Sequence, residues 1–168
     1  MLMKLHTLRP LRWLSVSCLL LLSSGCGWQL QGARHVSDTL MPLYMQLVDS
    51  HSDFSVALQA RLRAAGVRLT EDATQAQATL HVSKDETGHR VISVSESNTP
   101  LEYQVFYNIQ IELRSQSGEV LLQQPLSASR SITYNEAAAL AKQREERLLT
   151  INLASELADQ LLRQIRRL

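Results

Sequence analysis

The sequence of 168 residues lacks the motifs that mark the common catalytic and cofactor-binding sites. It has no Gly-rich phosphate loop, no cysteine cluster, no HExxH or other spaced set of metal ligands, and no GxSxG nucleophile. Its carboxylate pairs are expected in turns or on helix surfaces, where ionised and solvated side chains are the default. The sequence therefore indicates no enzyme, no cofactor and no metal site.

Long apolar runs are also lacking, and the run at residues 13–22 has the length found in signal peptides. Ten residues are too few for a stable membrane-spanning helix, which needs about 20. Three basic residues precede the run: Lys4, Arg9 and Arg12. Small residues, 23–25, separate it from Cys26. This order predicts a secretory signal peptide over residues 1–25.

Cysteine is scarce, since the chain has Cys18 and Cys26 alone. Residues 22–26 (LSSGC) resemble the bacterial lipobox, although Ser23 stands where a leucine is usual. We expect cleavage before Cys26 and lipidation of its thiol; a plain signal peptide with an incidental Cys26 is the alternative. Gly27 is not the Asp that retains similar lipoproteins in the inner membrane, which favours the periplasmic face of the outer membrane. Without a disulfide, the mature domain must rely on its hydrophobic core.

A strong net charge is missing as well. The chain has 17 basic and 16 acidic residues, and removal of the three basic leader residues leaves 14 against 16, a net charge of −2. This balance excludes a general nucleic-acid binder and a polybasic membrane surface. The 143 residues that follow the leader suffice for one domain. We expect a leader (1–25), a lipidated segment (26–40) and a single domain (41–168).

The first part of this domain shows one strand pattern and one helix pattern. Residues 41–48 alternate apolar and polar side chains, which predicts a strand. From Ser52 the apolar residues recur at helical spacing as Phe54, Leu58, Leu62 and Ala65. Ser52 or Asp53 can cap this helix, and Gly66 can end it. Residues 70–77 have no apolar periodicity and are expected to form a loop.

Three segments of β pattern follow. In 78–96 the composition of 84–88 (KDETG) predicts a turn, so we expect either a ragged hairpin or a long bent strand. Residues 101–113 alternate most clearly, with one apolar and one polar face. A turn at Gly118 leads to 119–133, where Pro125 cannot donate a ladder hydrogen bond and favours an edge strand or a bulge.

The C-terminal segment predicts a long helix that Asn135 can cap and that has no Gly or Pro after residue 136. Its second half carries an apolar stripe at helical spacing. The stripe comprises Leu148, Ile151, Ser155, Ala158, Leu162 and Ile165, and it is flanked by Ala154, Leu157, Leu161 and Leu168. Residues 142–147 are charged on all sides, which fits either a solvated helix segment or a surface for a partner or ligand.

The order β-α-β-β-β-α predicts an α+β fold: a two-layer sandwich in which two helices cover one face of a sheet of about four strands. The His81 and His89 side chains flank the predicted turn, and two imidazoles across a hairpin can share a metal. Because no third ligand is near them in sequence, we expect exposed side chains at strand ends.

Three short motifs stand in order along the chain: residues 26–32 (CGWQLQG), 101–104 (LEYQ) and 139–142 (ALAK). They are similar to the CG-aromatic-x-L-x-G opening, the start of the long strand and the entry of the last helix in one family of lipopolysaccharide-assembly lipoproteins, LptE, which the chain therefore resembles. The order of elements is similar too, so the resemblance spans the mature chain. Glu96 departs from it, because some members have a basic residue there.

The resemblance implies a lipid-anchored partner of the outer-membrane β-barrel LptD that plugs the barrel lumen, assists its assembly and binds lipopolysaccharide. A plug in a polar lumen needs a polar surface, which the polar face of residues 101–113 can supply; an ordinary solvated sheet face is the alternative. A second hypothesis is a free periplasmic carrier of a lipid or glycolipid, which would need a pocket. A hydrolase ranks third, because no nucleophile-base pair is evident.

The predicted lipopolysaccharide-binding residues are Lys142, Arg130 and Arg144. Lys142 stands at the family-like position, and its ammonium can contact a lipid A phosphate. Arg144 lies two residues further on, and Arg130 in the preceding strand can approach the same end of the helix. The alternative is that Lys142 pairs with Glu145 or Glu146 on a solvated helix.

Overall fold

The computed structural model describes residues 35–133 and 139–168. The predicted leader, the lipidation site Cys26, most of the segment 26–40 and the cap at Asn135 lie outside these residues. No helix of the described part is both long and apolar enough to cross a membrane.

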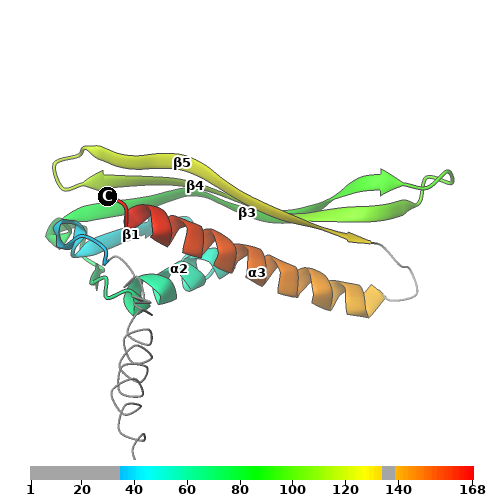
Figure 1. Cartoon of the computed structure of the whole chain (residues 1–168), viewed down its shortest axis with the longest axis horizontal. Coiled ribbons are helices and arrows are strands. Elements are labelled where there is room, and N and C mark those ends of the chain that lie inside the picture. The colour runs from blue at the N-terminus through cyan, green and yellow to red at the C-terminus, as the bar shows by residue number, and fades with distance from the viewer. Residues whose placement is uncertain (1–34, 134–138) are drawn as a thin grey trace, which may run out of the picture. The chain divides into compact units, whose positions relative to one another are not determined.

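The described residues form an α+β fold with a sheet and two helices, as predicted. The elements, in chain order, are β1 (Leu43–Leu47), α2 (Asp53–Ala64), β2 (Leu69–Thr70), β3 (Ala78–Val94), β4 (Pro100–Ser115), β5 (Val120–Thr133) and α3 (Ala139–Ile165), with single 3-10 turns at Asp38–Leu40 and Ala73–Gln75. Both helices lie on one side of the sheet (Figure 1). The two-layer sandwich is thereby confirmed.

The sheet has five strands in the order β2-β1-β3-β4-β5, where about four were expected. The additional strand, β2, has two residues and pairs parallel with the start of β1. Part of the predicted loop is therefore strand. A two-residue strand has no periodicity of its own, and the pairing depends on backbone bonds such as the one from Leu43 N to Arg68 O, at 2.8 Å.

Helix α2 begins and ends where the sequence predicts. The Ser52 hydroxyl accepts a hydrogen bond from Ser55 N at 3.1 Å and caps the first turn. Phe54, Leu58 and Leu62 are fully buried, and burial of each such side chain contributes about 1.5–3 kcal/mol. Gly66 follows the helix with a φ of +79°, a conformation that glycine adopts without a Cβ penalty.

The predicted turn at residues 84–88 is wrong, because β3 is one continuous strand of 17 residues. These residues pair antiparallel with residues 106–110 of β4. A shift of register between Val82 and Lys84 absorbs the irregularity and bends the strand. Turn-forming composition is overridden here because the long strand β4 pairs with this segment along its whole length. The alternative of one long bent strand is confirmed.

Strand β4 has the predicted alternation, and Val105, Tyr107, Ile109, Ile111 and Leu113 are buried beneath the helices. Leu101 belongs to the same pattern but is 46% exposed. Strand β5 pairs antiparallel with β4 and lies at the edge of the sheet. The edge position predicted from Pro125 is therefore confirmed.

Helix α3 buries the C-terminal part of the predicted stripe and three of its flanking residues, but not the first two members of the stripe. Leu148 is 61% and Ile151 is 38% exposed, although both were placed on the apolar face. The buried side chains are Leu153, Ala154, Leu157, Ala158, Leu161, Leu162 and Ile165. Apolar residues surround much of this helix, and the orientation that packs against both α2 and the sheet was selected by those partners.

Candidate functional site on the long helix

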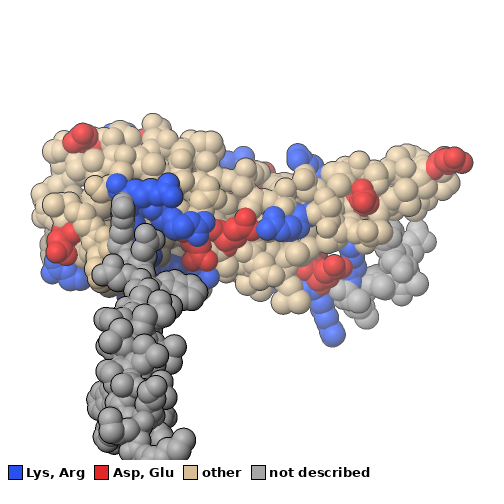
Figure 2. All heavy atoms as spheres, viewed as in Figure 1, with Lys and Arg blue, Asp and Glu red and all other residues tan. Residues whose placement is uncertain are grey.

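The first half of α3 presents charged side chains beyond the packed core. Residues 142–151 contain the predicted Lys142 and Arg144, together with Arg147 and the exposed Leu148. Figure 2 shows basic and acidic side chains interspersed over the visible face of the described residues, without one large basic region. Recognition of an anion here depends on a few local side chains.

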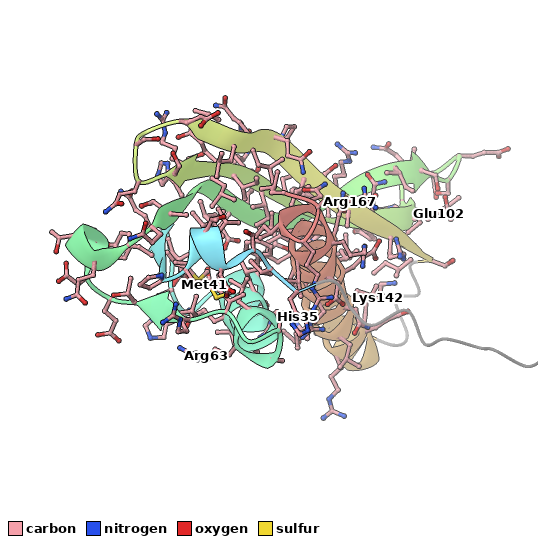
Figure 3. All side chains as sticks on the ribbon, turned by 60° about the vertical axis from the view of Figure 1, so that its left-hand side comes forward. His35, Met41, Arg63, Glu102, Lys142 and Arg167 are labelled. Atoms are coloured by element: carbon pink, nitrogen blue, oxygen red, sulfur yellow. The ribbon has the colours of Figure 1, made fainter. Side chains whose placement is uncertain are left out.

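Lys142 lies near the beginning of α3, beside the end of β5 (Figure 3). Its Nζ donates a hydrogen bond to the Thr133 backbone oxygen at 2.5 Å and is 3.7 Å from Glu145 Oε2. The side chain is 13% exposed. The lysine therefore connects the helix to the last residue of β5 and retains the predicted pairing with an acid.

Arg144 is exposed and forms no ion pair with another described residue. It borders a shallow depression of about 420 Å³ together with Gln143, Arg147 and Leu148. The depression combines two guanidinium groups with an exposed leucine. Such a surface can contact an anionic group and an aliphatic chain at the same time.

Arg147 is held by an acid that the sequence did not suggest. Its two terminal nitrogens bond both carboxylate oxygens of Asp53, in the first turn of α2, and the Nη2–Oδ1 distance is 2.8 Å. Hydrogen bonding and the charge of Asp53 raise the pKa of Arg147 above its usual value. The residues are 94 positions apart, so no local spacing reveals the pair.

Arg130 does not approach Lys142 in this structure. Its Nη2 is 2.8 Å from Glu156 Oε2. Glu156 is 14 residues beyond Lys142 on α3, about 21 Å along the helix axis. The three predicted ligand-binding residues thus have separate surroundings: Lys142 contacts Thr133 and Glu145, Arg144 borders the depression, and Arg130 pairs with Glu156.

His89 joins the sheet to the same half of the helix. Its Nδ1 is 2.6 Å from Glu146 Oε1, and its ring meets Tyr103 edge-on with centroids 5.6 Å apart. His81 is eight residues earlier on β3, about 26 Å away in an extended strand. The expectation of strand-end positions was wrong, since both are inside β3. The described residues contain no cluster of three potential metal ligands.

A buried polar cluster fixes the start of α2 to the middle of the sheet. Asp85 accepts hydrogen bonds from the Ser52 hydroxyl at 2.5 Å and the Tyr107 hydroxyl at 2.8 Å, and Tyr107 accepts one from Phe54 N at 3.4 Å. Burial, followed by the nearby Asp85 carboxylate, raises the pKa of Tyr107 well above 10. All these groups bond one another inside the fold, which is a structural arrangement.

Comparison with known proteins gives one family throughout. The profile of the family described as LptE, Lipopolysaccharide-assembly, matches residues 40–165. The LPS-assembly lipoprotein LptE of Pectobacterium atrosepticum is 26% identical over 146 residues, which cover 86% of this chain and 79% of that protein. The protein of the same name from Yersinia pestis is 24% identical over 146 residues, which cover 86% of this chain and 70% of that protein.

Solved structures show the same fold. The crystal structure of the rare lipoprotein B from Shewanella oneidensis has a TM-score of 0.64 at 21% identity, and covers 73% of this chain and 92% of its own. The solution NMR structure of lipoprotein B from Nitrosomonas europaea has a TM-score of 0.67 at 21% identity. The match covers 83% of this chain and 90% of that structure. At these identities the likeness concerns the arrangement of sheet and helices.

Proposed function

Because the chain belongs to the LptE family of lipopolysaccharide-assembly proteins, we propose that it is an outer-membrane lipoprotein that plugs the LptD β-barrel, assists assembly of that barrel and helps to transport lipopolysaccharide into the outer membrane. The names of its relatives as LPS-assembly lipoproteins support the role in assembly. No step of this role requires catalysis, and we propose a non-enzymatic protein.

The uncovered outer face of the sheet is the observation that carries the plug proposal. Both helices pack on the inner face (Figure 1), and the outer face of β4 and β5 is polar. Its side chains include Gln104, Asn108, Gln110, Glu112, Gln123, Ser127, Ser129 and Ser131. A barrel lumen lined by polar side chains and water can accept this surface without desolvating an apolar patch.

Direct lipopolysaccharide binding is proposed at the first half of α3, where Arg144 borders the depression that Arg147 and Leu148 also line. A lipid A phosphate would contact the guanidinium of Arg144, and an acyl chain would contact Leu148. Lys142 would contribute charge beside them once its ammonium exchanges Glu145 for a phosphate. Arg130 would act as a separate contact further along the helix.

The anchor is proposed at Cys26, after removal of residues 1–25, with 26–40 as the lipidated segment and 41–168 as one domain. Each buried methylene of an acyl chain contributes about 0.8 kcal/mol to membrane attachment. Cys26→Ala should abolish acylation and leave the protein uncleaved or soluble. Radiolabelled palmitate and fractionation of the periplasm measure this, and label in the variant would contradict the assignment.

Co-purification tests the plug against the alternative of a free lipid or glycolipid carrier. The tagged full chain is extracted from membranes in mild detergent and separated by size. A plug elutes with a barrel several times its own mass, whereas a carrier elutes alone. Mass spectrometry of the co-eluting band identifies an LptD-type barrel, and elution of the lipoprotein alone would contradict the proposal.

A further inference from the structure

The outer face of the sheet, which the proposed function turns toward the barrel lumen, contains a hollow of about 280 Å³. Its lining residues are Glu86, Arg90, Phe106, Asn108, Ser127, Ala128 and Ser129. Three cross-strand rows of β3, β4 and β5 meet here: Arg90–Gln104–Ser131, Gly88–Phe106–Ser129 and Glu86–Asn108–Ser127, of which Gln104 and Ser131 lie beside the hollow. Alternation along a strand places these side chains opposite the buried face. The ring of Phe106 is thereby surrounded by polar side chains. We call these side chains the polar frame; they are Glu86, Arg90, Gln104, Asn108, Ser127, Ser129 and Ser131.

Phe106 forms the floor of the hollow because its neighbour is glycine. A Cβ added at Gly88 would be 3.1 Å from Phe106 Cζ and 3.4 Å from Cε1, so the absence of a side chain at Gly88 makes room for the far end of the ring. A phenylalanine in an otherwise polar row, placed against a glycine, offers an aromatic platform on which another apolar surface can stack.

The polar frame is pre-organised by hydrogen bonds among its own members. Arg90 Nε donates to Gln104 Oε1 at 2.7 Å, and Gln104 Nε2 donates to Ser129 Oγ at 3.1 Å. The Arg90 guanidinium carbon is 5.9 Å from the Phe106 ring centroid. Gln104 is thus fixed beside the platform, and the exposed Arg90 guanidinium lies over the ring and must move aside when a ligand stacks there; both groups have further donors or acceptors available.

Charge in the frame is balanced locally. Glu86 carries the frame's negative charge and pairs with Lys84 at 2.7 Å, outside the three rows. Arg90 carries the positive charge and contacts an amide and an aromatic ring. A frame with one charge of each sign and several neutral amides and hydroxyls does not select an anion. It suits a neutral ligand with many hydroxyl groups.

The geometry points to a binding site for one neutral pyranose ring on the outer face of the sheet. A pyranose has a face of C–H groups that stacks on an aromatic ring, and a rim of hydroxyls that bond to amides, carboxylates and guanidinium groups. The volume is at the lower end of small-molecule pockets, which span roughly 300–1,000 Å³, so the occupant is a single ring of a saccharide.

This inference does not rest on the proposed function, since it concerns the isolated lipoprotein and a small sugar. Saturation-transfer NMR on the full chain in an amine-oxide detergent, which has no sugar head group, measures the contact. The probes are methyl glucoside, methyl mannoside and N-acetylglucosamine at about 10 mM, which suits dissociation constants near 1 mM. We expect transfer to the C–H protons of at least one probe.

Two variants test the platform. Phe106→Leu keeps an apolar side chain but removes the π face, and should reduce the transfer about two- to tenfold. Gly88→Ala pushes the ring from its position and should reduce the transfer as well. Gln46→Ala, at an exposed position on the same outer face but on β1, away from the hollow, is the matched control and should bind like the wild type. Circular dichroism verifies that each variant is folded.

Three outcomes overturn the inference. The first is no transfer to any of the three probes. The second is equal transfer in the wild type and in both folded platform variants. The third is stronger transfer to glucose 6-phosphate than to methyl glucoside, because that would make the hollow an anion site. Loss of barrel co-purification would leave each of these results unchanged, so the two proposals fail separately.

Discussion

The two halves of α3 are held in place by different forces. From Leu153 to Ile165 the helix presents buried leucines, alanines and an isoleucine to α2 and the sheet. Before Leu153 it is held by polar links to other elements. These are Lys142 to Thr133, Glu146 to His89 and Arg147 to Asp53. One half is fixed by removal of apolar surface from water, and the other by exposed polar contacts.

Because of this difference, the packed half of α3 contributes mainly to folding stability, and the charged half is available for ligand binding. Burial of apolar area stabilises a helix whatever the salt concentration, whereas exposed ion pairs contribute little and are screened. A charged half-helix therefore adds modestly to folding and leaves its side chains able to exchange partners. We expect substitutions in the two halves to have separate effects on stability and on ligand binding.

The largest effect is expected from Leu161→Asp, in the packed half. Leu161 is fully buried, and an unpaired carboxylate at that position should lower the free energy of unfolding by about 3–5 kcal/mol or prevent folding. Urea unfolding measures the change. Leu148→Asp is the matched control in the charged half, where the side chain is 61% exposed, and it should cost less than about 0.5 kcal/mol. A similar loss of unfolding free energy in the two variants would contradict the division of α3 into a packed half and a charged half.

A smaller effect is expected from Tyr107→Phe beneath the junction of the two halves. It removes the hydroxyl that bonds Asp85 and Phe54 N, and loss of a buried partner costs about 1–3 kcal/mol at neutral pH. The raised pKa of Tyr107 adds a pH dependence. Above pH 10 the unfolded chain loses the phenol proton while the folded chain keeps it, so stability falls with rising pH.

The pH dependence gives Tyr107→Phe a second, independent measurement. The wild type should lose stability more steeply than the variant between about pH 10 and 11, by up to 1.36 kcal/mol per pH unit for one group. Equal slopes in the wild type and Tyr107→Phe would show that the phenol is not shielded from water.

A third prediction concerns ligand binding and the charged half. Lys142→Glu and Arg144→Glu should each weaken lipopolysaccharide binding about three- to tenfold at low salt, and less at high salt because exposed charges are screened. Arg163→Glu makes the same charge change on an exposed site of the packed half and should have no effect. Thermal melting of Arg144→Glu and Arg163→Glu should stay near the wild type, whereas Lys142→Glu should melt lower, because it loses the bond to Thr133 O and places a second carboxylate beside Glu145. Equal affinities would leave Lys142 and Arg144 as ordinary surface residues.

The smallest effect is expected from the ion pair that joins the charged half to α2. Arg147→Ala should lower stability by about 0.2–1 kcal/mol, because the arginine is largely exposed. A double-mutant cycle with Asp53→Ala isolates the coupling, and 1 M salt should reduce it. A coupling free energy far above about 1 kcal/mol between Arg147 and Asp53 would mean that the charged half of α3 is held more firmly than the exposure of Arg147 indicates.

Several features were determined by the sequence alone. The spacing of Phe54, Leu58 and Leu62 specified α2 and its buried face, and strict alternation specified β4, because each pattern fits one backbone period. Pro125 specified an edge strand, since a proline nitrogen cannot donate to a neighbour. Local stereochemistry decides these features, and neighbouring residues suffice to reveal them.

Other features were decided by the tertiary structure. The composition of residues 84–88 favours a turn, but pairing with β4 made the segment a strand. The buried side of α3 was set by its packing partners, since apolar residues occur around much of the helix. The charge of Arg147 is visible in the sequence, but its partner Asp53 lies 94 residues earlier in the chain. Contacts between segments far apart in the chain have no local signal, because they form only when the fold brings those segments together.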